Sequence, residues 1–409
     1  MSKKNGEEAA GYPVQPEEEQ VTDVEKSFVE LERHRTAIFE HAAAFVLKRI
    51  DAGLETFGPC AYPAPSSVGG VYAAIANFEW TSGFWSGMLW LAYELTGNEK
   101  YRQAAESQLP DYRARLDNRI GTDTHDLGFL YSLSAVNEYR ITGNPKAREA
   151  GLVAAELLSS RYLPEAGIVQ AWGNLNDPEE RGRMIIDCLM NLPLLYWASE
   201  ETGDPRYADQ ARSHVRQSAR FLVRPDRTTY HTYYMDAETG EPKYGTTHQG
   251  YADDSCWARG QAWGIYGFML SYLYTQETDL MELSKTLAEY FAERTPPDGV
   301  VYWDLVFLTG TAQERDSSAS AVAVCGLLEL ARHLPSGEQR QQAKRQALAI
   351  LTALDAGYTT RNLPGSNGVL KHSVYNKPRG IGIDECTIWG DYYYFEALVR
   401  VLKPSLWDK

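Results

Sequence analysis

Two aspartates in unusual surroundings are the residues of this sequence best suited to acid–base chemistry. Asp187 lies in the apolar run Met184-Ile-Ile-Asp-Cys-Leu-Met190, and Asp126 lies in Thr124-His-Asp-Leu-Gly-Phe129. Burying an unpaired carboxylate is costly, so Asp187 must be paired, protonated or facing a cavity. A carboxyl group that faces an apolar cavity has a raised pKa and can donate a proton near neutrality. The alternative role for both residues is structural, as a helix cap or a buried ion pair.

A second group of polar residues is typical of a binding site for an anion or a sugar. His231 begins a His-Thr-Tyr-Tyr segment, and within the later segment 247–263 Arg259 follows Trp257 by two residues in an otherwise neutral helix. A buried arginine needs a carboxylate, and its planar guanidinium matches one well. That carboxylate could belong to a substrate, or it could be the side chain of Asp253 or Asp254.

No metal or cofactor site is apparent in the spacing of the other polar residues. The eight histidines are dispersed, and the pair His125–Asp126 lacks an obvious third ligand. A glycine-rich phosphate loop and a Gly-x-Ser-x-Gly motif are both missing from the sequence. We therefore expect no metal and no cofactor.

These candidate residues lie in a chain of repeated helical hairpins. Residues 89–104, 135–150 and 195–210 each combine an apolar helix, a Thr-Gly-Asn or Thr-Gly-Asp stop and the start of a second helix. Glycine favours the left-handed C-cap conformation, and the following Asn or Asp suits the next N-cap. The repeat of about 45–65 residues predicts helical pairs along the chain.

Six apolar helices begin with segments that carry an acidic residue. These segments are 78–85, 124–129, 183–191, 254–263, 316–320 and 384–391. A helix that is apolar all round is buried on all sides, whereas the alternating helices, such as 344–354, are amphipathic. Six inner and six outer helices predict an all-α (α/α)6 toroid. Its parallel inner helices would start at one end and gather the acids there.

Few segments predict strands. Residues 231–236 and 300–305 could form short hairpins, and residues 222–253 have no helical period. We interpret this last segment as a long loop over the mouth of the toroid.

Composition excludes several classes of protein. The chain has 409 residues and a net charge of −15, which argues against binding to nucleic acid or to an anionic membrane. It has no run of 18 apolar residues and no apolar signal segment. Five scattered cysteines without a CxxC pair indicate reduced thiols and a cytoplasmic protein. We expect a flexible acidic tail over residues 1–22 and one catalytic domain over 23–409.

Several long segments resemble the unsaturated glucuronyl hydrolases of glycoside hydrolase family 88. They are WTSGFWSGMLWLAYELTGN, THDLGFLY, IIDCLMNLPLLYWASEETGD, THQGYADDSCWARGQAWGIYG and GIDECTIWGDYYYFEAL. The resemblance spans roughly residues 70–400 and implies the toroid, a cytoplasmic location and no metal. It also implies a substrate: a lyase-generated disaccharide or short oligosaccharide whose non-reducing uronate has a C4=C5 double bond.

The resemblance further implies how this substrate is hydrolysed. Asp187 resembles the residue that protonates C4 and activates the water that adds to C5, and Asp126 resembles its partner carboxylate. The hydrated sugar then opens and expels the second sugar. Other positions that match the family's pocket are Trp80, His125, Trp172, His231, Gln249, Arg259 and Trp263. Of these, we expect Arg259 to neutralise the uronate and the tryptophans to stack on sugar rings.

The segment 370–379 resembles the loop that meets the second sugar. Ser373 and Lys377 are candidates there for contacts to a sulfate, together with Lys371 and Arg379, although a solvated basic loop has the same composition. Chondroitin, hyaluronan, heparin and gellan fragments all stay open as substrate sources. The alternatives to this function are an unsaturated rhamnogalacturonyl hydrolase and a non-catalytic glycan-binding toroid. The presence of both Asp126 and Asp187 argues against the non-catalytic protein. The sequence predicts no oligomeric state.

Overall fold

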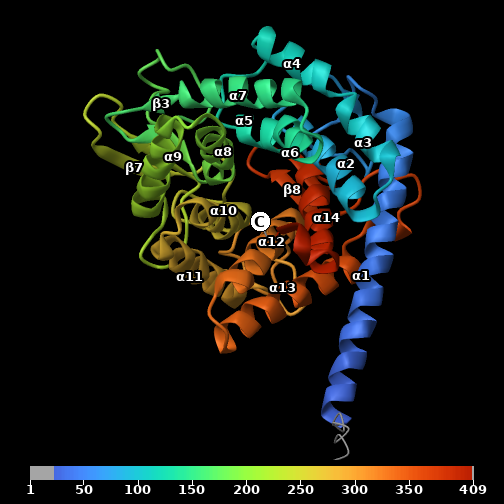
Figure 1. Ribbon diagram of the computed structural model, residues 1–409. Helices are drawn as coiled ribbons and strands as arrows, with labels where there is room; N and C mark the ends of the chain where they lie inside the picture. The colour runs from blue at the N-terminus through green and yellow to red at the C-terminus, as the bar shows by residue number, and fades with distance from the viewer. Residues whose placement is uncertain (1–22, 408–409) are drawn as a thin grey trace, which may run out of the picture.

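Paired helices arranged in a ring make up most of the protein (Figure 1). The structure, a computed structural model, describes residues 23–407, and within residues 23–35 it describes only the backbone. The predicted acidic tail, residues 1–22, lies outside the described residues. The chain runs once around the ring, from α2 past α7, α9 and α11 to α14, so the first and last inner helices are neighbours.

Inner helices alternate with outer helices, and the six pairs within residues 23–407 confirm the predicted (α/α)6 toroid. The inner helices are α2 (Ser82–Thr96), α5 (Leu127–Tyr131) with its continuation α6 (Asn137–Thr142), α8 (Pro193–Thr202), α10 (Ala258–Thr275), α12 (Ser317–His333) and α14 (Ile388–Leu402). The outer helices are α1 (Asp23–Thr56), α3 (Glu99–Glu106), α4 (Leu109–Asp117), α7 (Pro145–Ser159), α9 (Pro205–Gln217), α11 (Thr278–Arg294) and α13 (Glu338–Gly357).

The repeated Thr-Gly-Asn and Thr-Gly-Asp motifs form the turns between paired helices, as predicted. Gly97, Gly143 and Gly203 end their helices with φ of 69°, 74° and 74°. The side chains of the next residues accept hydrogen bonds from backbone N–H groups at the start of the following helix. Each motif therefore terminates an inner helix and caps an outer one.

Glycines allow neighbouring inner segments to approach closely. A Cβ on Gly83 would lie 2.1 Å from the Phe129 carbonyl oxygen, and a Cβ on Gly128 would lie 2.4 Å from the Asn191 Cα. A Cβ on Gly326 would lie 2.9 Å from the Tyr266 Cα. Since these neighbours are backbone atoms, a larger residue would push the helices apart.

Short strands and irregular helices fill the connections between the helices. A three-stranded antiparallel sheet contains β5 (Arg183–Ile185), β6 (Thr232–Met235) and β7 (Pro242–Thr246), and β8 (Ser373–Asn376) pairs with β9 (Ile381–Glu385). Two small hairpins pair β1 (Tyr62–Pro63) with β2 (Ala74–Ile75) and β3 (Tyr162–Leu163) with β4 (Ile168–Val169). The irregular elements are the π-helical turns η1 (Ser132–Val136) and η3 (Ser218–Leu222), and the 3₁₀ helices η2 (Ile186–Met190), η4 (Thr360–Asn362) and η5 (Pro404–Trp407).

Two predictions about these connections need correction. Residues 222–253 are not simply a loop, because they contribute β6 and β7 to the three-stranded sheet. Residues 300–305 form no hairpin; Tyr302 and Asp304 make only isolated bridges, to Arg315 and Trp257. The predicted strand within 231–236 is confirmed as β6.

No helix among residues 23–407 is both long enough and apolar enough to cross a lipid bilayer.

Candidate active site

The starts of the inner helices meet at one end of the ring. Trp80, just before α2, stacks on Trp389 at the start of α14 and contacts Phe129 in α5, with ring centroids 5.1 and 5.5 Å apart. Phe129 in turn contacts Trp263 in the first half of α10, at 5.4 Å. The predicted gathering of distant segments at one end is therefore present, and the candidate residues lie along this end.

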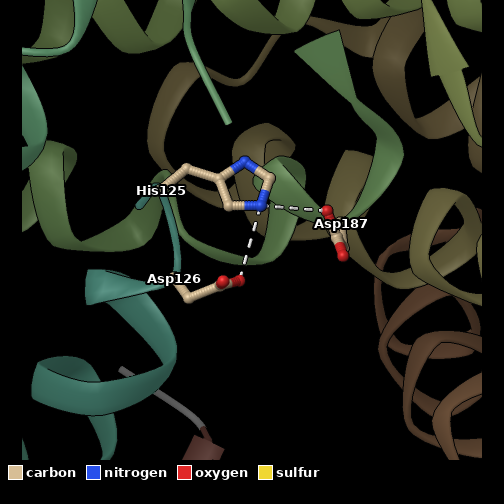
Figure 2. Close-up of side chains that lie close together, drawn as sticks. All are labelled: His125, Asp126 and Asp187. Carbon is tan, nitrogen blue, oxygen red and sulfur yellow. Dashed lines mark ion pairs between the residues drawn. The ribbon is translucent and has the colours of Figure 1, made fainter. Parts of the chain in front are cut away.

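His125 lies between the two candidate carboxylates (Figure 2). Its Nε2 atom is 3.4 Å from Asp126 Oδ1 and 3.2 Å from Asp187 Oδ1. The His125 side chain is buried, whereas the side chains of Asp126 and Asp187 keep 13 % and 17 % of their exposure. The carboxylates thus border space that solvent can reach, which a substrate-binding pair requires.

Asn191 holds the segments of both aspartates together. Its Oδ1 accepts a hydrogen bond from the Phe129 N–H at 2.7 Å, and its Nδ2 donates to the Asp187 carbonyl oxygen at 3.1 Å. Thr124 supports the other side of the pair by donating to Asp126 Oδ2 at 2.7 Å. The amide of Asn191 therefore fixes the start of α5 against η2, and with it the spacing of the carboxylates.

The two carboxyl groups differ in pKa because their surroundings differ. Burial raises the pKa of Asp126, and the charge of Asp187 raises it further against the opposing charge of His125. Burial also raises the pKa of Asp187, but His125 outweighs this effect and leaves that pKa lowered. Burial lowers the pKa of His125, yet the two carboxylates hold it well above its usual range. The predicted raised pKa is therefore wrong for Asp187 in the free site, because the sequence does not show His125 beside it.

The same three residues offer the ligand types that bind divalent metals. One ligand atom from each of His125, Asp126 and Asp187 lies within 4.8 Å of the others. The sequence-based statement that His125–Asp126 lacks an obvious third ligand is thus corrected, since Asp187 arrives from a different helical pair. Histidine and carboxylate oxygens also suit a proton-sharing cluster, so a chelator is needed to decide between the two.

Arg259 is buried and its positive charge is balanced inside the protein. Its Nη1 donates to Asp316 Oδ2 at 2.8 Å, and its Nη2 donates to Gln249 Oε1 at 2.9 Å. The guanidinium also donates to the carbonyl oxygens of Val374 and Tyr375. The suggested protein partners, Asp253 or Asp254, are therefore wrong, because the partner is Asp316 at the start of α12. Arg259 thus joins α10, α12 and β8, and it orients the Gln249 amide.

Gln249 and His231 form one side of the site. Gln249 Nε2 lies 3.4 Å from His231 Nε2, and His231 Nδ1 lies 2.6 Å from Thr232 Oγ1. Burial lowers the pKa of His231 to about 3, so its ring is neutral at physiological pH. The His231 ring also packs against His248, with centroids 5.7 Å apart.

The three candidate tryptophans occupy different environments. Trp80 is partly exposed and donates to the Tyr375 hydroxyl at 3.0 Å. Trp172 is 36 % exposed, whereas Trp263 is only 1 % exposed and packs between Phe129 and Tyr393. Trp80 and Trp172 can therefore present a ring to a sugar, whereas Trp263 packs in the aromatic core and supports Phe129, which contacts Trp80.

Ser373 and Lys377, the two candidates in the second-sugar loop, already contact other side chains of the protein. Ser373 is fully buried and lies 2.8 Å from the Ser317 hydroxyl, and Lys377 forms an ion pair with Glu314. Arg379, at the turn between β8 and β9, is exposed. Among the basic residues proposed for this loop, Arg379 is the one placed most openly toward solvent.

Asn191, Asp316 and Tyr375 were not identified as site residues from sequence. Asp316 lies in one of the six acidic helix starts, so the sequence indicated its position but not its partner, Arg259. Asn191 follows the Asp187 segment directly, but an isolated asparagine carries no sign of a contact with Phe129. The contact between Trp80 and Tyr375 joins residues far apart in the chain.

Comparisons with known proteins relate the whole chain to one family. The profile of Glycosyl Hydrolase Family 88 matches residues 68–393. An unsaturated glucuronyl hydrolase of Bacillus sp. (strain GL1) is 48 % identical, over 85 % of this chain and 92 % of its own length. An unsaturated chondroitin disaccharide hydrolase of Streptococcus pneumoniae is 44 % identical, over 88 % of this chain and 90 % of its own.

A solved structure shares the fold. It is a mutant unsaturated glucuronyl hydrolase of Streptococcus agalactiae complexed with dGlcA-GalNAc6S, with a TM-score of 0.80 and 41 % identity over 95 % of this chain and 94 % of that chain. The profile match, the identities and the shared fold lead to one conclusion: the chain belongs to glycosyl hydrolase family 88 and is a glycosidase.

Proposed function

We propose that this enzyme releases the 4,5-unsaturated uronate from the non-reducing end of disaccharides and short oligosaccharides produced by polysaccharide lyases. The observation that carries the proposal is the pair of partly exposed carboxylates joined through His125 at 3.4 and 3.2 Å. A vinyl ether needs a proton donor at one carbon and then a base for the water that adds to the next, and one carboxyl group beside a protonated histidine can perform both steps in turn.

In the proposed reaction, the Asp187 carboxyl donates a proton to C4 of the unsaturated uronate. The resulting carboxylate then takes a proton from the water that forms a bond to C5. The product is a hemiketal at C5, which opens to a ketone and leaves a hemiacetal at C1. That hemiacetal expels the second sugar as an alcohol and becomes an aldehyde, so one water is consumed for each bond cleaved.

Asp187 must hold a proton when the substrate is bound, although its pKa is lowered in the free site. The uronate brings a negative charge and displaces water, and both effects raise the pKa of a nearby carboxyl group. The protonated His125 can supply this proton through its 3.2 Å contact with Asp187. Asp126 contributes a negative charge on the other side of His125 and is placed to hold a sugar hydroxyl.

Chondroitin-derived disaccharides are the first substrates to test, because the Streptococcus relative carries that activity in its name. The free thiols of all five cysteines support the cytoplasm as the proposed compartment. No metal enters the proposed reaction.

Loss of the absorbance of the conjugated uronate measures the reaction directly. We expect this loss with unsaturated chondroitin or hyaluronan disaccharides and unchanged rates after treatment with a chelator. Heparin, gellan and unsaturated rhamnogalacturonan disaccharides complete the panel. Turnover of the rhamnogalacturonan product alone would replace the proposal, and loss of activity on chelation that added metal restores would assign a metal to the His125 cluster.

A further inference from the structure

Two buried arginines support the segment that carries Trp172. Arg161 donates to the carbonyl oxygens of Gln170, Ala171 and Gly173, at distances between 2.6 and 3.1 Å. Arg183 donates to the remaining carbonyl, that of Trp172, at 3.0 Å. Four consecutive carbonyl oxygens thus face arginine side chains, which fixes the backbone beneath the exposed indole ring.

Arg183 also lies flat against the indole. Its Cζ atom is 3.7 Å from the centroid of Trp172 and 5.5 Å from that of Tyr234, and its Nε donates to the Tyr234 hydroxyl at 3.0 Å. Tyr234 stacks in turn on Tyr244, with centroids 5.0 Å apart. The guanidinium is therefore held between two aromatic rings, and the exposed part of Trp172 lies over a fixed positive charge.

No carboxylate lies within ion-pair distance of this charge among residues 36–407, although Glu180 lies nearby. Arg183 is 6 % exposed and Arg161 is 3 % exposed, and neither forms an ion pair within 4.0 Å among residues 36–407. The nearby Glu180 carboxylate instead accepts the Asn174 N–H at 2.5 Å. Arg259 differs, because Asp316 balances it at 2.8 Å. A nearly buried cation that forms no direct ion pair can still gain stabilisation from an anion that arrives with the substrate.

The Trp172 ring is connected to the catalytic site through two histidine rings. It lies 5.3 Å from the His248 ring, which lies 5.7 Å from His231, the neighbour of Gln249. Burial lowers the pKa of His248, and the charges of Arg183 and Arg379 lower it further, so the positive field of Arg183 reaches this wall. In the chain, Arg183 is the first residue of β5, and Asp187 lies in η2, which directly follows that strand.

We propose that Arg183 is a specificity-determining residue, whose charge beside Trp172, free of a direct ion pair, selects sugars that carry an anionic substituent on this wall. The substituent is either the uronate carboxylate or a sulfate ester on the second sugar, and both present the same chemistry to the guanidinium. This inference rests on the proposed function, since it assumes that the substrate is an unsaturated uronyl disaccharide. It assigns the electrostatic selection to Arg183, while Arg259 positions Gln249.

The test compares Arg183→Gln and Arg183→Lys with the wild type on three substrates. These are the unsulfated unsaturated chondroitin disaccharide, its 6-sulfated form and the methyl ester of the unsulfated form. For Arg183→Gln we expect KM to rise about tenfold on each substrate whose anion Arg183 selects, with kcat little changed. Arg183→Lys keeps the charge and should retain most of the preference. Arg206→Gln is the matched control, because Arg206 on the outer helix α9 also stacks on a ring, that of Tyr207, but its charge is paired with Glu156 of α7.

The pattern across substrates separates the outcomes. A KM increase for both unsulfated and sulfated acids, but not for the ester, assigns the uronate carboxylate, whereas an increase confined to the sulfated substrate assigns the sulfate. An equal loss on all three substrates overturns the proposal and makes Arg183 a structural support. If Arg183→Gln does not fold, a folded Arg183→Lys enzyme that no longer distinguishes acid from ester also overturns it. Absence of activity in the wild type would instead count against the proposed function.

Discussion

Two groups of acids along the inner helices differ in how their charges are balanced. Asp126 and Asp187, at the starts of the inner segments, share a single histidine and keep partial exposure. Glu329 and Glu396, further along α12 and α14, are nearly inaccessible and both pair with Arg400. Tyr266 completes the second group by donating to Glu396 at 2.5 Å and accepting from Arg400 at 2.6 Å.

The difference shows which buried acids can react. Burial raises the pKa of Glu329, but a hydrogen bond from His333 and the charge of Arg400 lower it to about 2. This carboxylate is fully partnered and has no proton to give near neutrality. The Asp126–Asp187 pair has fewer partners and opposite pKa shifts, so its proton can move. Partial exposure and a shared histidine, rather than burial itself, distinguish the Asp126–Asp187 group from the Glu329–Glu396 group.

The largest expected effect is on the rate when Asp187 is replaced. Asp187→Asn should lower kcat by about three orders of magnitude or more, because an amide cannot exchange a proton with C4 or with water. Its melting temperature should stay close to that of the wild type. Steady-state kinetics and thermal unfolding of the purified variant measure both quantities. Near-normal turnover would remove Asp187 from the mechanism.

Replacing Arg400 should instead lower the stability of the protein and leave the rate of the folded enzyme nearly unchanged. Arg400→Met removes the cation that Glu329 and Glu396 share, and we expect a loss of about 3–5 kcal/mol in unfolding free energy. The kcat of the molecules that remain folded should be unchanged within a factor of about two. Urea unfolding and active-fraction kinetics test this pattern, with the exposed Arg345→Met on α13 as the control. A large fall in kcat without a loss of stability would make the two acid groups functionally alike.

Asn191 should affect both stability and rate, but less strongly. Asn191→Ala leaves the buried Phe129 N–H without its acceptor, which costs about 1–3 kcal/mol. It also loosens the spacing between Asp126 and Asp187, so we expect kcat to fall about tenfold or more. Asn367→Ala is a matched control, since Asn367 clamps the backbone of Tyr72 through the same two groups at 2.7 and 3.1 Å. Equal kcat values for the two variants would exclude a positioning role for Asn191.

Local patterns in the sequence were sufficient for the fold. The caps at Gly97, Gly143 and Gly203 and the six helix starts depend on residues that are neighbours in the chain, so the toroid and the shared end of its inner helices could be predicted. The positions of Asp126 and Asp187 followed from two of those starts. The family resemblance added proposed roles for residues such as Trp80 and Gln249, whose contacts are not visible in any local pattern.

Charge balance could not be predicted, because it depends on partners that are distant in sequence. Glu329 in Leu-Leu-Glu-Leu-Ala gives the same local signal as Asp187, an acid in an apolar run, yet Arg400 makes it structural. Asp316, the partner of Arg259, lies in another helical pair, so the local sequence offered Asp253 and Asp254 instead. The direction of the Asp187 pKa shift likewise depends on the fold, which places His125 beside Asp187. Residues 300–305 form no hairpin because they have no partner strand.

The smallest expected effect concerns His214, which lies behind the site on α9 and stays neutral. Burial lowers its pKa to about 3, and the charge of His125 lowers it further against the opposing charge of Asp187. In the unfolded chain its pKa is about 6.5. Its stabilising contribution is therefore complete above pH 6.5 and decreases as the pH falls toward 3, by about 1.4 kcal/mol for each pH unit.

His214→Asn keeps an acceptor for the Val169 N–H, which His214 Nδ1 accepts at 2.9 Å, but has no group to protonate. Between pH 7 and pH 5, the unfolding free energy of the wild type should fall about 2 kcal/mol more than that of the variant, as measured by urea unfolding at each pH. His125, which the two carboxylates keep protonated, should give no such acid sensitivity. Parallel pH profiles for wild type and variant would mean that His214 is protonated in the folded enzyme, and that the unbalanced charge of the Asp126–Asp187 group extends further than its contact with His125.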